Sequence, residues 1–155
     1  AIRVGPGEFP GCRSQILFPE VVVPVATPGF AAEHGLSAAS TAHDVHQVPF
    51  VHVDDGGSPW MTWADWLAEF GIAMRRLPGR VLFHNYPMVL QQTLLGRGVA
   101  LGWRPLIDEY VTGGLLEIVG PEVRSSRGYY VTWPTDAGSE HVDALVDWLL
   151  AERSG

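Results

Sequence analysis

The stretch VLFHNYPMVLQQTLLGRGVALGWRP, from Val81 to Pro105, determines how the rest of the chain is interpreted. It begins with the apolar run VLF, which is typical of a short strand. Asn85 is well placed to cap a helix, and Gly96 is well placed to end it in a left-handed conformation. The apolar run from Gly98 to Gly102 then predicts a second strand that is buried on both faces.

The glycines of this stretch look at first like a dinucleotide-binding fingerprint. That fingerprint follows a strand and opens a helix, because its phosphates sit on the free N–H groups of the helix N-terminus. Gly96, Gly98 and Gly102 follow a predicted helix and open a predicted strand instead. No nucleotide cofactor is therefore expected here, and no other cofactor is predicted.

The phrase LLGRGVALG, followed by Trp103-Arg104-Pro105, resembles the effector-binding domain of LysR-type transcriptional regulators. More narrowly, it is similar to the subgroup of the glycine-cleavage activators and β-lactamase regulators. Further landmarks of the resemblance follow in order along the whole chain: AIRVG at Ala1, LFPEVVVPVATP at Leu17, FVHVDD at Phe50, WADWLAEFG at Trp63, GYYVTWP at Gly128 and VDWL at Val146.

Strand and helix patterns alternate through the rest of the sequence, which favours an α/β architecture with largely parallel pairing. Pro19 and Pro24 are expected to limit how much of Ile16 to Val25 pairs in a sheet. Ser58-Pro59 is expected to start a helix, and the polar segment Pro121 to Gly128 is expected to be flexible. A last helix is predicted from Ser139 to Glu152, with a buried stripe formed by Val142, Leu145, Val146 and Leu149.

The resemblance implies a fold like that of a type II periplasmic binding protein, with two α/β lobes. Residues 20–124 would form one complete lobe, the second regulatory subdomain. Residues 1–19 and 125–155 would be the remaining part of the first regulatory subdomain, whose N-terminal half is missing. The apolar face of that part would then be uncovered. Either the missing segment or another chain would cover that face, and the resemblance implies a homodimer or tetramer.

The strongest candidate site lies where two predicted strands end, because ligands of open α/β sheets bind beyond the carboxyl ends of strands. Asp54 and Asp55 follow one strand, and Asn85 follows the next. The family places its effector contacts at these exits and on the facing lobe. The predicted effector-binding residues are Arg3, Val4, Gly5, Asp54, Asp55, Ser58, Trp60, Asn85, Tyr86, Gly102, Trp103 and Tyr129. The alternative is that Asp54 and Asn85 only cap helices and turns.

Other chemistries find little support in the sequence. His43, His46 and His52 lack the spacing of a metal site, so no metal is predicted. No G-x-S-x-G elbow is present, and Cys12 has no neighbouring histidine. No catalytic residue is predicted, and the domain is expected not to be an enzyme.

The charge balance argues against direct binding to nucleic acid. The net charge is −7, and all ten basic residues are arginines. A phosphate backbone calls for a concentrated basic face. DNA would be bound only through an N-terminal winged helix-turn-helix that is absent from this chain. The single cysteine and the lack of an export signal or an apolar span predict a cytoplasmic location, away from membranes.

The resemblance thus implies an effector-sensing regulatory domain of a LysR-type transcription factor, which binds a small metabolite in the cleft between its two lobes and mediates oligomerisation. The alternative is a solute-binding protein of a membrane transport system, which has the same kind of fold. The upstream sequence would separate the two, since a winged helix-turn-helix indicates the regulator and a signal peptide the transport protein.

Overall fold

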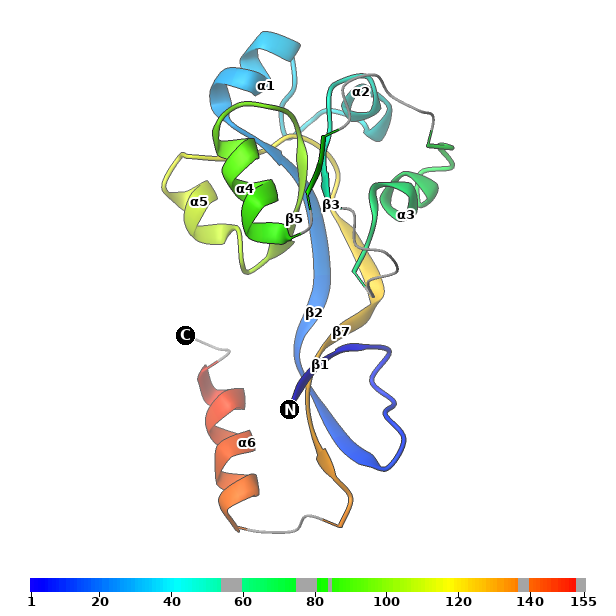
Figure 1. Ribbon diagram of the computed structural model, residues 1–155, viewed down its shortest axis with the longest axis vertical. Coiled ribbons are helices and arrows are strands. Elements are labelled where there is room, and N and C mark those ends of the chain that lie inside the picture. Colours follow the sequence, from blue (N-terminus) through cyan, green and yellow to red (C-terminus); the bar gives the residue numbers. More distant parts are fainter. Residues whose placement is uncertain (54–59, 75–80, 84, 137–139, 153–155) are drawn as a thin grey trace. The chain divides into compact units, whose positions relative to one another are not determined.

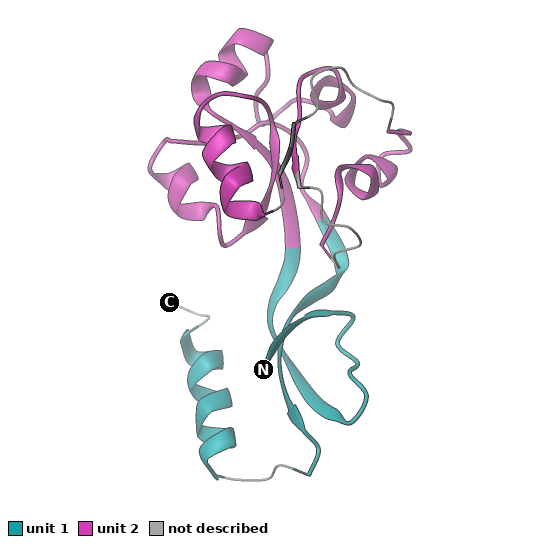
Figure 2. Cartoon of the chain, viewed as in Figure 1, with its two compact units in different colours: residues 1–20, 124–155 teal, residues 21–123 magenta. Residues whose placement is uncertain are grey.

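The computed structural model describes residues 1–53, 60–74, 81–83, 85–136 and 140–152 (Figure 1). The chain forms two compact units, coloured separately in Figure 2. Unit 1 contains Ala1–Glu20 and Arg124–Gly155, and unit 2 contains Val21–Val123. The assignment of these units to the first and second regulatory subdomains stays a prediction.

The helices and strands of the described residues follow one another in the order β1 (Ile2–Gly5), β2 (Cys12–Ala26), α1 (Pro28–His34), α2 (Ala42–His46), β3 (Val51–Val53), α3 (Trp63–Ala68), β4 (Val81–Phe83), α4 (Tyr86–Leu94), β5 (Ala100–Arg104), α5 (Asp108–Thr112), β6 (Glu117–Ile118), β7 (Val123–Pro134) and α6 (Glu140–Glu152). The strand–helix–strand prediction for the stretch from Val81 to Pro105 is confirmed by β4, α4 and β5.

Helix ends follow local signals in most places. Asn85 caps α4, since its Oδ1 accepts a hydrogen bond from the backbone N–H of Met88 at 3.0 Å, and Gly96 follows the helix with a φ of 70°. The predicted start of a helix at Ser58-Pro59 lies outside the described residues. Helix α3 is capped by Thr62, whose hydroxyl accepts from the N–H of Asp65 while the Asp65 carboxylate accepts from the N–H of Thr62. This reciprocal capping box sets the start of α3 at Trp63.

The prediction of largely parallel pairing is wrong. The main sheet has the order β1-β7-β2-β5, with β6 on β2, and the pairs β1–β7, β2–β5 and β2–β6 are antiparallel. Strands β3 and β4 are parallel, and Phe50 forms a parallel bridge with Val99. Helices connect β3 to β4 and β4 to β5, and a helical connection of this kind leaves the strands that it joins parallel. Strand β2 enters unit 2 from unit 1 without such a connection.

Two expectations about the segments that form β2 and β7 are also wrong. Strand β2 runs without interruption through Pro19 and Pro24, and the carbonyl of Pro24 accepts from the N–H of Val119 at 2.9 Å. Proline removes a donor but leaves its carbonyl available to the sheet. The segment predicted as flexible, 121–128, belongs largely to β7, which begins at Val123.

Unit 2 packs helices on both faces of its sheet (Figure 1). Val22 and Trp103 lie opposite each other on β2 and β5, and both belong to the core formed with α1, α2 and α3. Val23 and Val25 belong to the second core, with α4 and the residues around α5. This alternation along one strand explains why the VVV run is apolar at every position.

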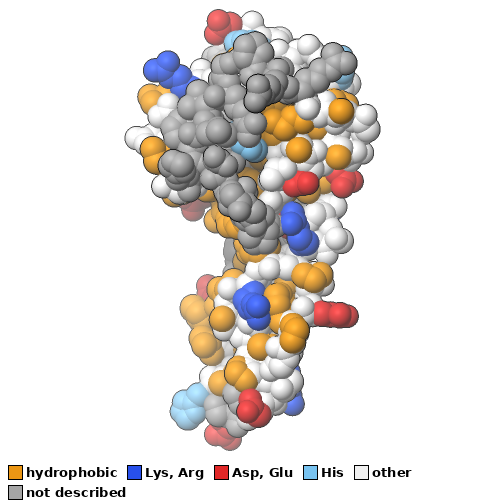
Figure 3. Space-filling model, turned by 45° about the vertical axis from the view of Figure 1, so that its right-hand side comes forward, with side chains coloured by type: hydrophobic (Ala, Val, Ile, Leu, Met, Phe, Trp, Pro, Cys, Tyr) orange, Lys and Arg blue, Asp and Glu red, His pale blue; other side chains and the backbone are white. Residues whose placement is uncertain are grey.

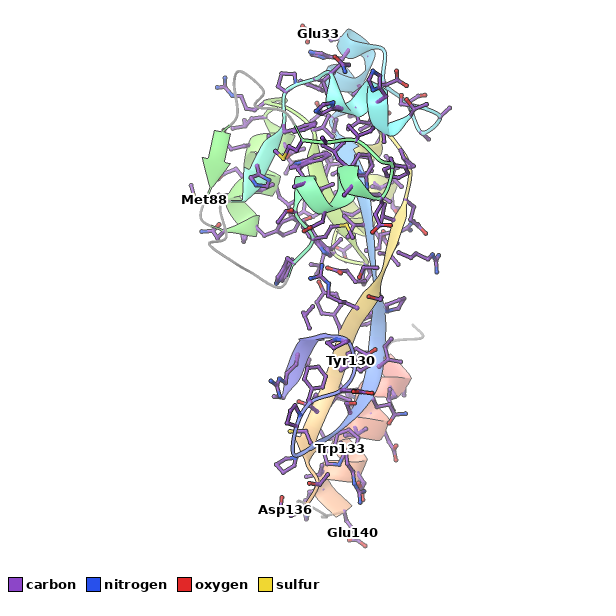
Figure 4. All side chains as sticks on the ribbon, turned by 90° about the vertical axis from the view of Figure 1, so that its right-hand side faces the viewer. Glu33, Met88, Tyr130, Trp133, Asp136 and Glu140 are labelled. Carbon is purple, nitrogen blue, oxygen red and sulfur yellow. The ribbon has the colours of Figure 1, made fainter. Side chains whose placement is uncertain are left out.

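Unit 1 has a small core in which Leu17, Val131 and Val146 are buried. Trp133 of β7 packs against this core beside α6 (Figure 4). The predicted stripe of α6 is wrong for Leu145, which is 55% exposed, because the sheet-facing side of the helix is formed by Val146 with Val142, Leu149 and Leu150.

Candidate functional site

The two strands that were expected to end beside each other do so. Val53 lies opposite Phe83 in the parallel pair of β3 and β4, so the carboxyl ends of these strands share one edge. The residues that follow, 54–59 and 84, lie outside the described residues. The effector contacts expected of Asp54, Asp55 and Ser58 therefore stay predictions.

An aromatic cluster in unit 2 gathers three of the predicted site residues from separate parts of the chain. Trp60 precedes α3, Tyr86 is the first residue of α4, and Trp103 lies on β5. The ring centroid of Trp103 lies 5.1 Å from that of Trp60 and 5.1 Å from that of Tyr86, in edge-to-face arrangements. Trp103 is buried, while Trp60 and Tyr86 are half-buried. The cluster thus contains two partly exposed aromatic rings, those of Trp60 and Tyr86, which both pack against the buried ring of Trp103.

Two other predicted site residues of unit 2, Asn85 and Gly102, have structural roles. The side-chain oxygen of Asn85 is engaged in capping α4, as the alternative interpretation proposed. Gly102 is buried, and a Cβ at this position would lie 3.1 Å from Cγ1 of Ile107 and 3.2 Å from Cγ2 of Val25. A side chain larger than hydrogen would displace Ile107, so the glycine is needed for packing in the second core. Their effector contacts stay predictions.

In unit 1 the predicted residues of β1 divide between the two faces of the sheet. Val4 lies opposite Tyr129, whereas Arg3 lies opposite Tyr130. Neighbouring strand residues point to opposite faces, so the side chains of Arg3 and Val4 cannot both face one ligand on one side. The guanidinium of Arg3 lies 4.5 Å from the ring centroid of Phe9. The next predicted residue, Gly5, is buried against that same ring.

A polar cluster in unit 1 was missed by the sequence interpretation. The side chain of Glu20 is fully buried, and its Oε2 accepts hydrogen bonds from Ser125 Oγ at 2.5 Å and from Arg127 Nε at 3.0 Å. Ser125, Arg127 and Tyr129 occupy alternate positions of β7 and so share one face of the strand. The available signal was a lone carboxylate inside the apolar run LFPEVVV, together with the alternation S-x-R-x-Y.

The hydroxyl of Tyr129 is buried beside this cluster. Burial raises the pKa of Tyr129 to about 12, and the negative charge of Glu20 adds to the rise while Arg127 opposes it. Tyr129 is therefore a neutral hydrogen-bonding group throughout the physiological pH range.

This pKa can be checked by titration. Since the pKa in the folded state lies above its ordinary value of about 10, the neutral phenol stabilises the fold below pH 10, and that contribution is lost as the pH rises toward about 12. The phenolate absorbance is measured against pH for the native chain and for Tyr129→Phe, and the difference between the two curves reports Tyr129. The midpoint of this difference should lie near pH 12 for the folded chain and near pH 10 in denaturant. A native difference curve centred at the ordinary value would contradict the burial of this hydroxyl.

Other chemical groups are dispersed. Among the described residues no three His, Cys, Asp or Glu side chains come together as metal ligands. His43 is exposed, while His46 is buried with its ring 6.3 Å from that of Phe50. Arginines lie singly over the described part of the face shown in Figure 3. No helix within the described ranges is long and apolar enough to cross a membrane.

Two α/β units connected through long strands define the type II periplasmic-binding-protein-like class of fold. The effector domain of the regulator AmpR of Pseudomonas aeruginosa has this fold, with a TM-score of 0.73, 22% identity, and coverage of 99% of this chain and 71% of that chain. The AmpR effector-binding domain of Citrobacter freundii gives a TM-score of 0.75 at 17% identity, covering 99% and 73% of the two chains.

The family model described as LysR substrate binding domain matches residues 1–154. The chain belongs to this family, as the resemblance of the GRGVALG segment predicted. The glycine cleavage system transcriptional activator of Escherichia coli K12 is 28% identical over 156 residues, which cover 99% of this chain and 49% of the relative. The HTH-type transcriptional regulator TrpI of Pseudomonas aeruginosa is 27% identical over 139 residues, covering 90% and 46%. The chain thus spans about half the length of these relatives.

Proposed function

We propose that this chain is the effector-sensing domain of a LysR-type transcription regulator that acts in the cytoplasm. It would bind a small metabolite and carry out no catalysis of its own. The observation that carries the proposal is the cluster of Trp60, Tyr86 and Trp103 at the start of α4, close to the shared edge where β3 and β4 end. Aromatic walls at the carboxyl ends of strands are the usual setting of a small-molecule site in α/β folds.

Sensing requires that the metabolite bind one arrangement of the two units better than another. Long strands β2 and β7 contribute residues to both units, so a change in these strands can transmit binding from one unit to the other. A coupling of about 1–3 kcal/mol is the usual scale of such a response. We infer that the response is passed to a homodimer or tetramer whose DNA-binding parts lie in winged helix-turn-helix domains outside this chain.

The alternative of a solute-binding protein for transport has the same fold. Both relatives named above are transcriptional regulators, which favours the sensor.

A ligand screen tests the proposal. We expect thermal-shift screening with amino acids, aromatic acids and cell-wall fragments to find a ligand that stabilises the native chain. Trp60→Ala should weaken its binding at least about fivefold, because a partly exposed aromatic ring at the centre of a site typically contributes more than about 1 kcal/mol.

Trp148→Ala is the matched control, since Trp148 lies on α6 of unit 1 and is 57% exposed. Its affinity for the ligand should stay within about twofold of the native value. A ligand that binds Trp60→Ala as tightly as the native chain would exclude the aromatic cluster as its site.

A further inference from the structure

Arg127 is held in place by a buried carboxylate. Its Nε donates to Oε2 of Glu20 at 3.0 Å, and the hydroxyl of Ser125 donates to the same oxygen. The Ser125 oxygen in turn accepts from the backbone N–H of Arg127 at 3.0 Å. The Glu20 side chain is fully buried, so this arrangement fixes both the position and the rotation of the guanidinium.

The outer edge of this guanidinium remains available. Within the part of the chain that the structure describes, the side-chain hydrogen bond of Arg127 uses Nε, and neither Nη atom makes one. The side chain is 29% exposed. The two Nη groups form a planar fork whose spacing matches a carboxylate or a phosphate.

The ion pair alone does not account for this cluster. A buried ion pair is seldom more stable than a well-packed apolar pair, because both charges lose their hydration. The neighbouring Tyr129 adds a hydrogen-bonding group without adding a negative charge that would repel an anion. An oriented arginine with an open fork is the arrangement expected of an anion-binding site.

We propose that Arg127 binds the anionic group of the effector, a carboxylate or phosphate, through its two Nη groups, with Glu20 and Ser125 as positioning residues. The effector class is then a small organic acid or a phosphorylated metabolite. This inference rests on the proposed sensing function for the identity of the ligand, but the anion site is testable by itself.

Inorganic phosphate and acetate, added at constant ionic strength, are the probes. In NMR spectra of the 155-residue chain, the Nε–H signal of Arg127 should shift with saturation at a dissociation constant of about 1–10 mM, the scale expected for one bidentate contact in water. Backbone N–H signals of Ser126 and Gly128 should follow the same curve.

The test variant is Glu20→Gln combined with Arg127→Gln, which removes both charges and leaves no unpaired buried carboxylate. It should weaken phosphate binding at least about tenfold, as read from Ser126 and Gly128. Arg13→Gln is the control, since Arg13 is an exposed arginine on β2; its loss makes the net charge more negative by one, whereas the double variant leaves the net charge unchanged. The phosphate affinity of Arg13→Gln should stay within about twofold of the native value.

Ser125→Ala tests positioning without any change of charge. It should speed the exchange of the Arg127 Nε–H with water and weaken phosphate binding about threefold, since the hydroxyl no longer fixes Glu20. Unchanged exchange and affinity would overturn the positioning role of Ser125.

Equal phosphate affinity in the double variant, or no saturable shift in the native chain, would overturn the anion site. A different outcome would contradict the sensing proposal alone. If no metabolite binds while phosphate saturates at Arg127, the anion site stands and the sensing function does not. Trp60→Ala should leave phosphate binding unchanged, since Trp60 belongs to unit 2.

Discussion

Replacing Gly98 with alanine is expected to lower the free energy of unfolding by about 3 kcal/mol. A Cβ at this position would lie 2.6 Å from the carbonyl oxygen of Pro49 and 3.1 Å from its carbonyl carbon. Both are backbone atoms, so no side chain can turn aside to make room. The N–H of Val99 donates to that same Pro49 oxygen at 3.0 Å, and the N–H of Val51 donates to Val99 at 2.9 Å. The added methyl group would therefore separate β3 from β5.

Denaturant unfolding followed by tryptophan fluorescence measures this loss. Gly29→Ala is the matched control, because Gly29 lies in the first turn of α1 and a Cβ there meets nothing within 4 Å. The control should be unchanged or more stable by up to about 1 kcal/mol, as alanine is the better helix former. Equal stability of the two variants would mean that the close approach to Pro49 does not constrain the fold.

The glycines of the opening stretch show how far the sequence alone reaches. The role of Gly96 was predictable, because a glycine directly after a helical pattern is a local signal. The roles of Gly98 and Gly102 were not, because they depend on Pro49 and Ile107, whose positions are set by the tertiary fold. The sequence rules excluded a nucleotide fingerprint but did not indicate what these glycines do.

For the strands and for the candidate site too, features with a local sequence signal were predictable, whereas features that depend on tertiary contacts were not. The apolar run of Val81 to Phe83 predicted β4, and the rule that ligands bind beyond strand ends led to Trp60 and Tyr86 as candidate site residues. The polar segment before Gly128 was interpreted as flexible and not as part of a strand, since its hydrogen-bonding partner Glu20 lies about a hundred positions earlier in the chain. Arg127 was missed for the same reason, because nothing near it in sequence distinguishes it from a surface arginine.

Replacing Arg127 with alanine is expected to lower the free energy of unfolding by about 3 kcal/mol, although the side chain is partly exposed. Glu20 is fully buried, and Arg127 is its charged partner at 3.0 Å. Removing the arginine takes a charged donor away from the carboxylate, and the hydroxyl of Ser125 is a neutral donor that cannot by itself offset the lost hydration of a charge. Arg13→Ala, which removes an exposed arginine from β2, should change stability by no more than about 0.5 kcal/mol.

A double-mutant cycle distinguishes loss of the ion pair from loss of packing by the long arginine side chain. Glu20→Gln should relieve much of the penalty of Arg127→Ala, because the remaining buried group is then neutral. The cost of the double variant should fall below the sum of the single costs by at least about 1.5 kcal/mol, whereas independent packing effects would add. Additive costs would show that Arg127 stabilises β7 through its aliphatic stem, and Glu20 would then need another source of compensation inside unit 1.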